Sequence, residues 1–322
     1  MEIFYRTLEQ MGTMFLLMLV GFLLKKAKIL PEKADVAMAK LETYIFCPAL
    51  ALYTQMTKCT VAAFTGNATL ILYGAVLILC AVGLSCPLSM LFVRNYKTSS
   101  GKAYQRNIYK YALTFGNFGF MGNFLALSVW GSDFFYQYSL FSLLINILCY
   151  SWGMYILIPK DQNAGIWANL KKGLTAPPIL ALALGIVLGL LDLGKYMPSF
   201  AVSALDTAGS CMGPVAMILA GVVIGGYDFK SLLTNKKVYI ATALRLVVIP
   251  AVMLLILKAL GADDTILTLT IIAFASPLGM NTIVYPAAYG GDTKTGASMA
   301  MISHVLSVVT IPLMYLLFVV VM

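Results

Sequence analysis

Long uninterrupted apolar runs recur along the chain, and their length limits what it can fold into. Residues 11–24, for example, read MGTMFLLMLVGFLL, and comparable runs continue to the last residue. A helix needs about 20 apolar residues to cross a hydrocarbon core of about 30 Å. A mean hydropathy of +0.88 and a charged fraction of only 11% exclude an ordinary soluble domain. Because the runs lack the alternation of outer-membrane strands, the sequence predicts an all-α integral membrane protein.

Ten transmembrane helices are predicted from the apolar runs and from the charged and Gly/Pro clusters that separate them. The first run is followed by lysines, whereas a signal peptide carries its positive charges in front, so we interpret this run as a helix. The predicted spans cover residues 8–25, 38–56, 67–93, 109–130, 134–158, 177–193, 200–226, 238–258, 266–289 and 296–321.

The lysines and arginines favour one side of the membrane. Four fall on one side, namely Arg6, Lys58, Lys195 and Lys258, and 17 of the 22 fall in the other set of alternate loops: Lys25, Lys26, Lys28, Lys33, Lys40, Arg94, Lys97, Lys102, Arg106, Lys110, Lys160, Lys171, Lys172, Lys230, Lys236, Lys237 and Lys294. By the positive-inside rule the richer side is cytoplasmic. We therefore expect a multi-pass protein of the cell inner (plasma) membrane with both termini outside. The net charge of +9 then reflects topology, so the expected partner is the lipid bilayer and no nucleic acid.

Three landmarks recur in the same order in the two halves of the chain. Pro48 of CPALALYTQM aligns with Pro214 of GPVAMILAGV, Pro87 aligns with Pro250, and VWGSD at 129–133 aligns with AYGGD at 288–292. The offsets are 166, 163 and 159 residues. We expect a first five-helix repeat over residues 1–160 and a second over residues 161–322. Because five is odd, the second repeat is inverted, as in many secondary transporters. The alternative is a chance match of Pro and Gly among apolar residues.

Two of the predicted spans contain helix-breaking residues halfway along. Residues 275–292 read ASPLGMNTIVYPAAYGGD, and at an offset of 159 they align with GNFGFMGNFLALSVWGSD at 116–133. Pro277 lies 11 residues into its span, which is roughly 16 Å deep at about 1.5 Å per residue. Lipid offers no partners for the backbone groups that a broken helix exposes. The pattern predicts broken crossover helices 4 and 9 whose half-helix ends and asparagine amides face a substrate. The alternative is a pair of kinked helices with a purely structural role.

Four segments of the chain carry a resemblance to a known family. They read GFLLKKAKILPEKADVAMAKLETYIFCPAL, GNFGFMG, LRLVVIPAVM and ASPLGMNTIVYPAAYGGDTKTGASMAMISHVLSVVTIPLMYLL. They resemble the bacterial auxin efflux carrier (AEC) family, relatives of the plant PIN auxin carriers. The resemblance implies two inverted five-helix repeats, interleaved scaffold and transport subdomains, elevator-type motion and small organic anions as substrates. The chain departs from the family at Phe124, where a proline is usual, so the first break would rest on glycines alone.

Candidate substrate-binding residues come from the two breaks and from the span beside the first one. The resemblance implies Asn117, Gly119, Phe120 and Gly122 in span four, and Pro277 and Asn281 in span nine. The complete set of candidates is Asn117, Gly119, Phe120, Gly122, Asn123, Asn146, Pro277, Gly279, Asn281 and Tyr285.

Four ionisable residues inside the spans are candidates for a charge role. We expect Glu42 and Asp206, each about one turn into its span, to lie at the membrane interface with a structural role. Arg245 has two open interpretations, an anchor that extends to the cytoplasmic face or a charge that attracts an anion. For His304, the only histidine, a helix–helix hydrogen bond is preferred to proton coupling.

No enzyme motif accompanies these residues. The sequence has no Ser-His-Asp order, no His-Glu-x-x-His and no phosphate loop, and its six cysteines form no Cys-x-x-Cys pair. We therefore expect no catalysis, cofactor or metal. The expected function is secondary active or facilitated transport of a small organic anion, a malate- or auxin-like carboxylate, by a homodimer. The alternatives are a sodium-coupled transporter of another solute and a ligand-binding membrane sensor.

Overall fold

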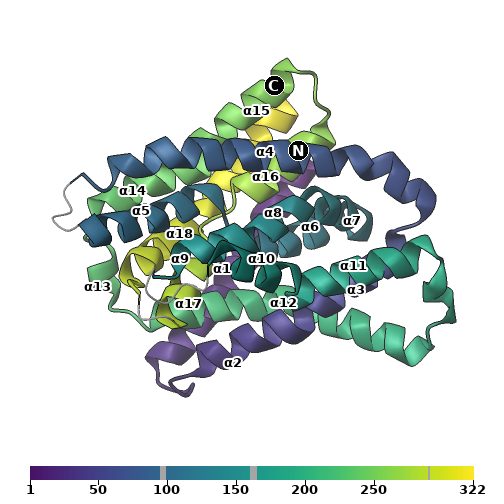
Figure 1. Ribbon diagram of the computed structural model, residues 1–322, viewed down its shortest axis with the longest axis horizontal. Helices are drawn as coiled ribbons and strands as arrows, with labels where there is room; N and C mark the ends of the chain where they lie inside the picture. The colour runs from purple at the N-terminus through teal and green to yellow at the C-terminus, as the bar shows by residue number, and fades with distance from the viewer. Residues whose placement is uncertain (95–98, 160–164, 289–290) are drawn as a thin grey trace.

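The computed structural model describes the chain except for residues 95–98, 160–164 and 289–290. Its described residues form helices joined by loops, and their only β feature is one isolated antiparallel bridge between Gly116 and Leu278 (Figure 1). The prediction of an all-helical membrane protein is confirmed. Lys97, Lys160 and two residues of the AYGGD landmark, where the ninth predicted span also ends, lie outside the described residues.

Six stretches of helix in the described part are long and apolar enough to cross a membrane. Three are single helices, namely α1 (Glu2–Lys26), α4 (Val61–Leu91) and α12 (Ser199–Gly225). The other three pass through or end in a wide π-helical turn: α2 (Ala34–Leu41), η1 (Glu42–Phe46) and α3 (Cys47–Lys58); α14 (Lys236–Ala243), η6 (Leu244–Val248) and α15 (Ile249–Ala259); and α18 (Lys294–Tyr315) with η7 (Leu316–Val321).

Two bent pairs raise the number of candidate spans to eight. In the first, α7 (Ser132–Phe141) meets the run of α8 (Leu143–Leu148), η3 (Cys149–Gly153) and α9 (Met154–Leu157) at 52°. In the second, α10 (Ile166–Leu174) meets α11 (Pro177–Leu190) at 49°. The remaining helices are α5 (Ser99–Thr114), η2 (Phe118–Gly122) with α6 (Asn123–Trp130), η5 (Leu193–Tyr196), α13 (Phe229–Leu232), α16 (Asp264–Phe274) and α17 (Asn281–Ala288). The predicted total of ten spans remains a prediction.

Capping residues explain where several helices begin. The side chain of Thr60 accepts from the backbone N–H of Ala63 at the start of α4, and Asp263 accepts from Ile266 at the start of α16. Each bond satisfies an N–H group that has no partner within its own helix. Pro177 stands at the first position of α11, where its missing N–H costs nothing.

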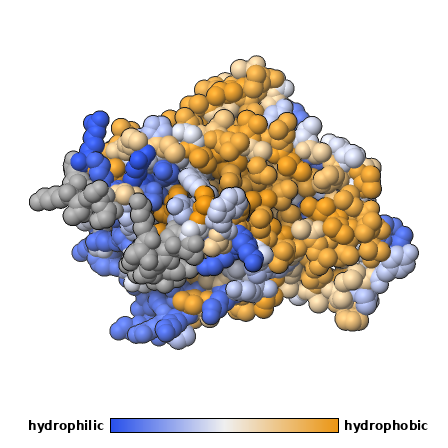
Figure 2. Space-filling view, viewed as in Figure 1, coloured by the Kyte–Doolittle hydropathy of each residue, from blue (hydrophilic) through white to orange (hydrophobic). Residues whose placement is uncertain are grey.

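The outer surface has the distribution of a membrane protein. Figure 2 shows apolar residues covering the middle of the molecule, with hydrophilic residues gathered at the left end and a smaller group at the right edge. Exposed large apolar side chains on α1, α4, α11 and α15 contribute to this surface, among them Leu16, Leu72, Val187 and Leu255. In Figure 1 both chain ends are marked away from the left end, where α13 and the start of α5 lie.

Two pairs of helices pack unusually closely through glycines. On α1, a Cβ at Gly21 would overlap the carbonyl oxygen of Ile218 on α12. On α11, a Cβ at Gly185 would come within 2.9 Å of the carbonyl oxygen of Leu52 on α3. Glycine is needed at both positions because any side chain would push the paired backbones apart.

Candidate functional site

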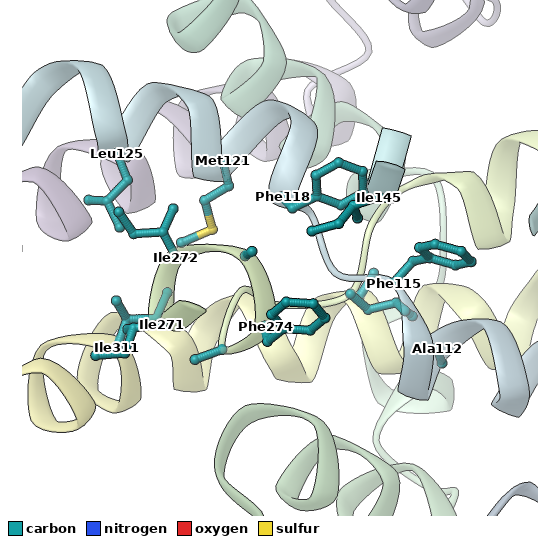
Figure 3. Packing of buried hydrophobic residues seen from close by; sticks show 14 of the residues in the cluster. Ala112, Phe115, Phe118, Met121, Leu125, Ile145, Ile271, Ile272, Phe274 and Ile311 are labelled. Atoms are coloured by element: carbon teal, nitrogen blue, oxygen red, sulfur yellow. The ribbon is translucent and has the colours of Figure 1, made fainter. Parts of the chain in front are cut away.

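The first predicted break lies between α5 and η2. α5 ends at Thr114, helix resumes at Phe118, and Gly116 and Asn117 connect the two parts. Figure 3 shows the chain leaving α5 beyond Ala112 and Phe115, passing the end of α16 near Phe274, and entering the next helix at Phe118. The break therefore forms without the family proline. The ring of Phe124, the residue in that position, lies against Gly213 of α12, where a Cβ would overlap it.

The second break lies between α16 and α17. α16 ends at Phe274, α17 begins at Asn281, and Pro277 lies between them. Proline cannot donate the hydrogen bond that a continuing helix requires, so the two halves separate at this residue.

The two breaks cross and are joined backbone to backbone. The N–H of Asn117 donates to the carbonyl of Pro277 at 2.6 Å, next to the bridge between Gly116 and Leu278. The N–H of Leu278 donates to the Ser303 hydroxyl of α18 at 2.9 Å. These bonds satisfy backbone groups that lipid would leave without partners.

Arg245 reaches this crossing from η6. Its side chain is buried, its Nη1 donates to the carbonyls of Thr114 at 3.1 Å and Leu113 at 3.4 Å, and its Nη2 donates to Ala273 at 3.2 Å. Of the two interpretations left open for Arg245, these contacts do not fit the anchor that extends to the cytoplasmic face. The residue turns inward because the ends of α5 and α16 offer carbonyls that no helical N–H satisfies.

His304 of α18 contacts the first crossover asparagine. Its Nδ1 lies 2.7 Å from the carbonyl of Ala300, and its Nε2 lies 3.2 Å from Nδ2 of Asn117. Because a carbonyl can only accept, Nδ1 carries the proton of a neutral ring and Nε2 accepts from Asn117. The expected helix–helix hydrogen bond is confirmed, and it fixes the orientation of the Asn117 amide.

The second crossover asparagine has a similar partner. Nδ2 of Asn281 donates to the Tyr111 hydroxyl at 2.9 Å and lies 3.6 Å from Sγ of Cys149. Tyr111 and Cys149 are themselves in contact at 3.1 Å. Asn117 thus uses one amide N–H within the protein, whereas Asn281 donates to the Tyr111 hydroxyl and, more weakly, to the Cys149 sulfur. Because sulfur is a weak acceptor, a substrate oxygen could replace Cys149 as the second partner of Asn281.

A cavity of about 60 Å³ lies at the crossing. It has room for a few water molecules, and it adjoins a larger cavity of about 390 Å³ that shares Phe120, Tyr150, Met280 and Asn281 with it. The larger cavity extends to Lys172 and Thr175, on the lysine-rich side of the molecule. The two cavities, which share these lining residues, thus lie between that side and the crossover.

Seven of the ten candidate residues line the smaller cavity, namely Asn117, Gly119, Phe120, Asn123, Asn146, Gly279 and Asn281. Tyr285 lines the larger cavity. The other two, Gly122 and Pro277, line neither of these two cavities. A Cβ at Gly122 would overlap the hydroxyl of Tyr138, and Pro277 contributes its carbonyl to Asn117.

Sequence reasoning missed several lining residues on the fifth predicted span. Ser139, Ser142 and Cys149 line the cavity beside Asn146. Their spacing of three, four and three residues would put all four on one face of an unbroken helix, and all four line the cavity although α7 and α8 meet at a bend. A polar stripe in an apolar span was the signal that could have identified them.

The two acidic candidates, Asp206 and Glu42, differ in their burial. Asp206 is exposed on α12. Glu42 is fully buried, and the structure gives no hydrogen-bond partner to its Oε1 among the described residues. Its Oε2 lies 3.9 Å from Sγ of Cys47, a cavity residue. Glu42 is buried because η1 packs against α12 and α11, and its structural role remains a prediction. Within the described ranges, no group of three His, Cys, Asp or Glu side chains is close enough to hold a metal ion.

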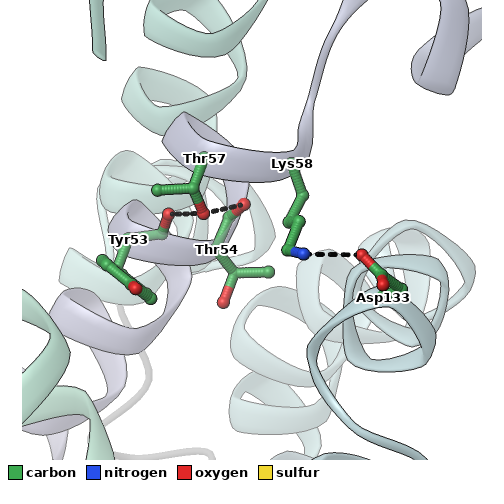
Figure 4. A network of polar contacts seen from close by, with 5 residues as sticks. All are labelled: Tyr53, Thr54, Thr57, Lys58 and Asp133. Carbon is green, nitrogen blue, oxygen red and sulfur yellow. Dashed lines mark hydrogen bonds and ion pairs between the residues drawn. The ribbon is translucent and has the colours of Figure 1, made fainter. Parts of the chain in front are cut away.

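Polar contacts also join α3 to α7, the helix that carries the cavity residue Ser139. Lys58 pairs with Asp133 at 2.7 Å (Figure 4). One helical turn before Lys58, the amide of Gln55 donates to the buried hydroxyl of Ser139. The larger cavity reaches Lys172 on the lysine-rich side, and the contacts between α3 and α7 lie at Lys58, which is predicted on the other side.

Comparison with known proteins finds a family and several relatives that the chain resembles. A family described as "Membrane transport protein" matches residues 7–169 and 166–315. The chain is 24% identical over 183 residues to the uncharacterized transporter YfdV of Escherichia coli (strain K12), covering 54% of this chain and 55% of that protein. It thus spans about half the length of this relative. It is 22% identical over 312 residues to an uncharacterized transporter of Methanothermobacter thermautotrophicus, covering 97% and 98% of the two chains.

Proposed function

The chain belongs to the membrane transport protein family of the auxin efflux carrier type, and from this premise we propose that it is a secondary transporter of small organic anions, with carboxylates as the substrate class. Membership makes it a multi-pass membrane transporter of a small molecule. The proposal adds the charge of that molecule, the site that binds it and the motion that carries it.

The observation that carries the proposal is the buried positive charge at the crossover. Arg245 is 2% exposed, and the three ion pairs among the described residues do not include it. A buried charge without a carboxylate partner is costly. The carbonyls at the ends of α5 and α16 offset part of it, and an anion in the cavity lined by Gly116, beside the guanidinium, would offset more. The amides of Asn117 and Asn281 add neutral donors, and the first turns of the helices that follow each break add positive dipole ends.

Helix packing supports two inverted repeats over residues 1–160 and 161–322. The contact between Gly21 and Ile218 joins the first predicted span to the seventh, and the contact between Gly185 and Leu52 joins the sixth to the second. If a two-fold axis relates the two halves, the contact between spans one and seven corresponds to the contact between spans six and two. The corresponding residues are 164 and 166 positions apart, which agrees with the sequence offsets. The total is ten if α5 with α6 is counted as span four and α16 with α17 as span nine, in addition to the eight candidate spans.

The same packing supports elevator-type movement. α1, α2, α3, α11 and α12 pack on one another and would form the scaffold, whereas α4 to α9 and α14 to α18 would carry the crossover. The closed contact at Lys58 and Asp133 joins one unit to the other. Alternating access would break this contact and move the cavity toward the outer side. We also propose outward-facing termini and a homodimer, which labelling and mass measurement in detergent can test.

Flux measurements in liposomes test the function. Purified protein is reconstituted, and electrical current or uptake is recorded for a panel of mono- and dicarboxylates and for matched amides and amines. Saturable transport of at least one carboxylate, with none for the neutral or cationic analogue, supports the proposal. Transport restricted to cations contradicts it. Binding of a carboxylate without any flux would instead identify a sensor.

A further inference from the structure

The crossover brings together two helix ends that attract a cation. The last carbonyl groups of a helix have no partner within it, and the helix dipole adds about half a negative charge there. α5 ends at Thr114 and α16 ends at Phe274, and both residues are buried. In transporters with interrupted helices, such carbonyls coordinate the coupling Na⁺ or H⁺. A positive group between these two ends would therefore be favourable.

Arg245 provides this charge from a third helix. Nη1 of its guanidinium donates to the carbonyls of Leu113 and Thr114 at the end of α5, and Nη2 donates to the carbonyl of Ala273 at the end of α16. A guanidinium suits this task because its donors diverge in a fixed plane. Arg245 also lies in the π-turn η6, a local widening that often marks functional positions.

The guanidinium fills the space at the first break as well. A Cβ at Gly116 would overlap Nη2 of Arg245 and would lie 2.8 Å from the carbonyl oxygen of Ser276. The carbonyls that a metal ion would need at these helix ends already accept from N–H groups of Arg245.

We propose that Arg245 is a built-in cation of the crossover, which takes the position of a coupling Na⁺ at the two helix ends, holds both breaks together and makes anion transport independent of Na⁺. The transport part of this inference rests on the proposed function. The role of Arg245 at the two helix ends is independent of the proposed function, and it can be tested without a substrate.

The first experiment uses the unaltered protein in detergent. Hydrogen exchange is followed by mass spectrometry in peptides that cover residues 112–119 and 273–281, in NaCl, KCl and choline chloride of equal ionic strength. We expect the same exchange rates in all three salts. Slower exchange of these peptides in Na⁺ alone would overturn the proposal, because it would show a Na⁺ site at the helix ends.

The second experiment removes the charge. Arg245→Ala should speed exchange in both peptides by about tenfold or more, since it deletes charged hydrogen bonds to both helices. Added guanidinium ion should restore slow exchange, whereas a purely structural role would allow no such rescue. Arg106→Ala is the matched control, because Nη2 of Arg106 also donates to a helix carbonyl, that of Cys86, away from the crossover. Unchanged exchange in Arg245→Ala would contradict the inference.

A third variant keeps the inference testable if Arg245→Ala does not fold. Arg245→Lys keeps the charge, but its single ammonium group cannot span both helix ends as the guanidinium does. We expect faster exchange in at least one of the two peptides. If both peptides exchange at the rate of the unaltered protein, the proposed contact of Arg245 with both helix ends is contradicted. Carboxylate flux is then compared in Na⁺ and choline, and a Na⁺ requirement would overturn the proposal. If no carboxylate is carried at all, the proposed function fails, while the exchange results still decide the role of Arg245.

Discussion

Replacing Asn281 by alanine should weaken carboxylate binding by about 10- to 100-fold. Asn281 lines the crossover cavity, and one of its two amide N–H groups is already used by Tyr111. The second donates to the sulfur of Cys149, a weak acceptor that a substrate oxygen could replace. A hydrogen bond to a charged group contributes about 1.5 to 3 kcal/mol, and about 1.4 kcal/mol corresponds to a factor of ten. The fold should lose only about 1 kcal/mol, the usual contribution of the neutral bond to Tyr111.

Titration calorimetry with the carboxylate found in the flux panel measures this effect, and thermal unfolding reports the fold. Asn67→Ala is the matched control, since Asn67 accepts a side-chain hydrogen bond from Gln137 and lines neither crossover cavity. Asn281→Asp should bind more weakly still, because a carboxylate would then face the substrate. If Asn281→Ala binds the carboxylate as tightly as the unaltered protein and the Asn67→Ala control do, the assignment of Asn281 as a substrate donor is refuted.

Three further changes probe the cavity and the topology. A Cβ at Gly119 meets no atom within 4 Å, and the same holds for Gly66 on α4. Gly119→Leu should therefore fill the cavity and abolish flux in a folded protein, whereas Gly66→Leu should leave flux unchanged. Equal flux in both variants would show that substrate passes elsewhere. His304→Ala removes the partner of Asn117 and should weaken binding by about 1 kcal/mol, roughly fivefold; calorimetry that shows a loss as large as that of Asn281→Ala would indicate direct contact with the substrate. In a cysteine-free background, Thr234→Cys should react with a membrane-impermeant maleimide only from the cytoplasm and Lys195→Cys only from outside, and the reverse pattern would invert the proposed topology.

The positions of the breaks could be predicted because they depend on local chemistry. Pro277 cannot continue a helix, and the glycines and asparagines around it and around Asn117 favour irregular backbone, so both interruptions were visible in the sequence. The constant offset between the two stretches also pairs them, and this pairing places most of the cavity residues in one predicted site.

The role of Arg245 could not be predicted in the same way. Its three acceptors lie on two other helices, and the nearest in sequence, Ala273, is 28 positions away. Hydropathy describes each helix by itself, so it left open whether Arg245 extends to the surface or faces the interior. The burial of Glu42 could not be predicted for the same reason, because it depends on packing against α12. The π-turns that contain both residues also have no recognised sequence signal.

A structure of the protein with its transported carboxylate bound, determined by electron cryomicroscopy, tests the crossover site most directly. We expect density for the carboxylate group between Asn117 and Asn281, within about 3.2 Å of at least one of the two amide nitrogens, and no ion between Arg245 and the carbonyls of Thr114 and Ala273. Density for the carboxylate elsewhere in the molecule, with the crossover cavity unchanged, would contradict the assignment of this cavity as the transport site.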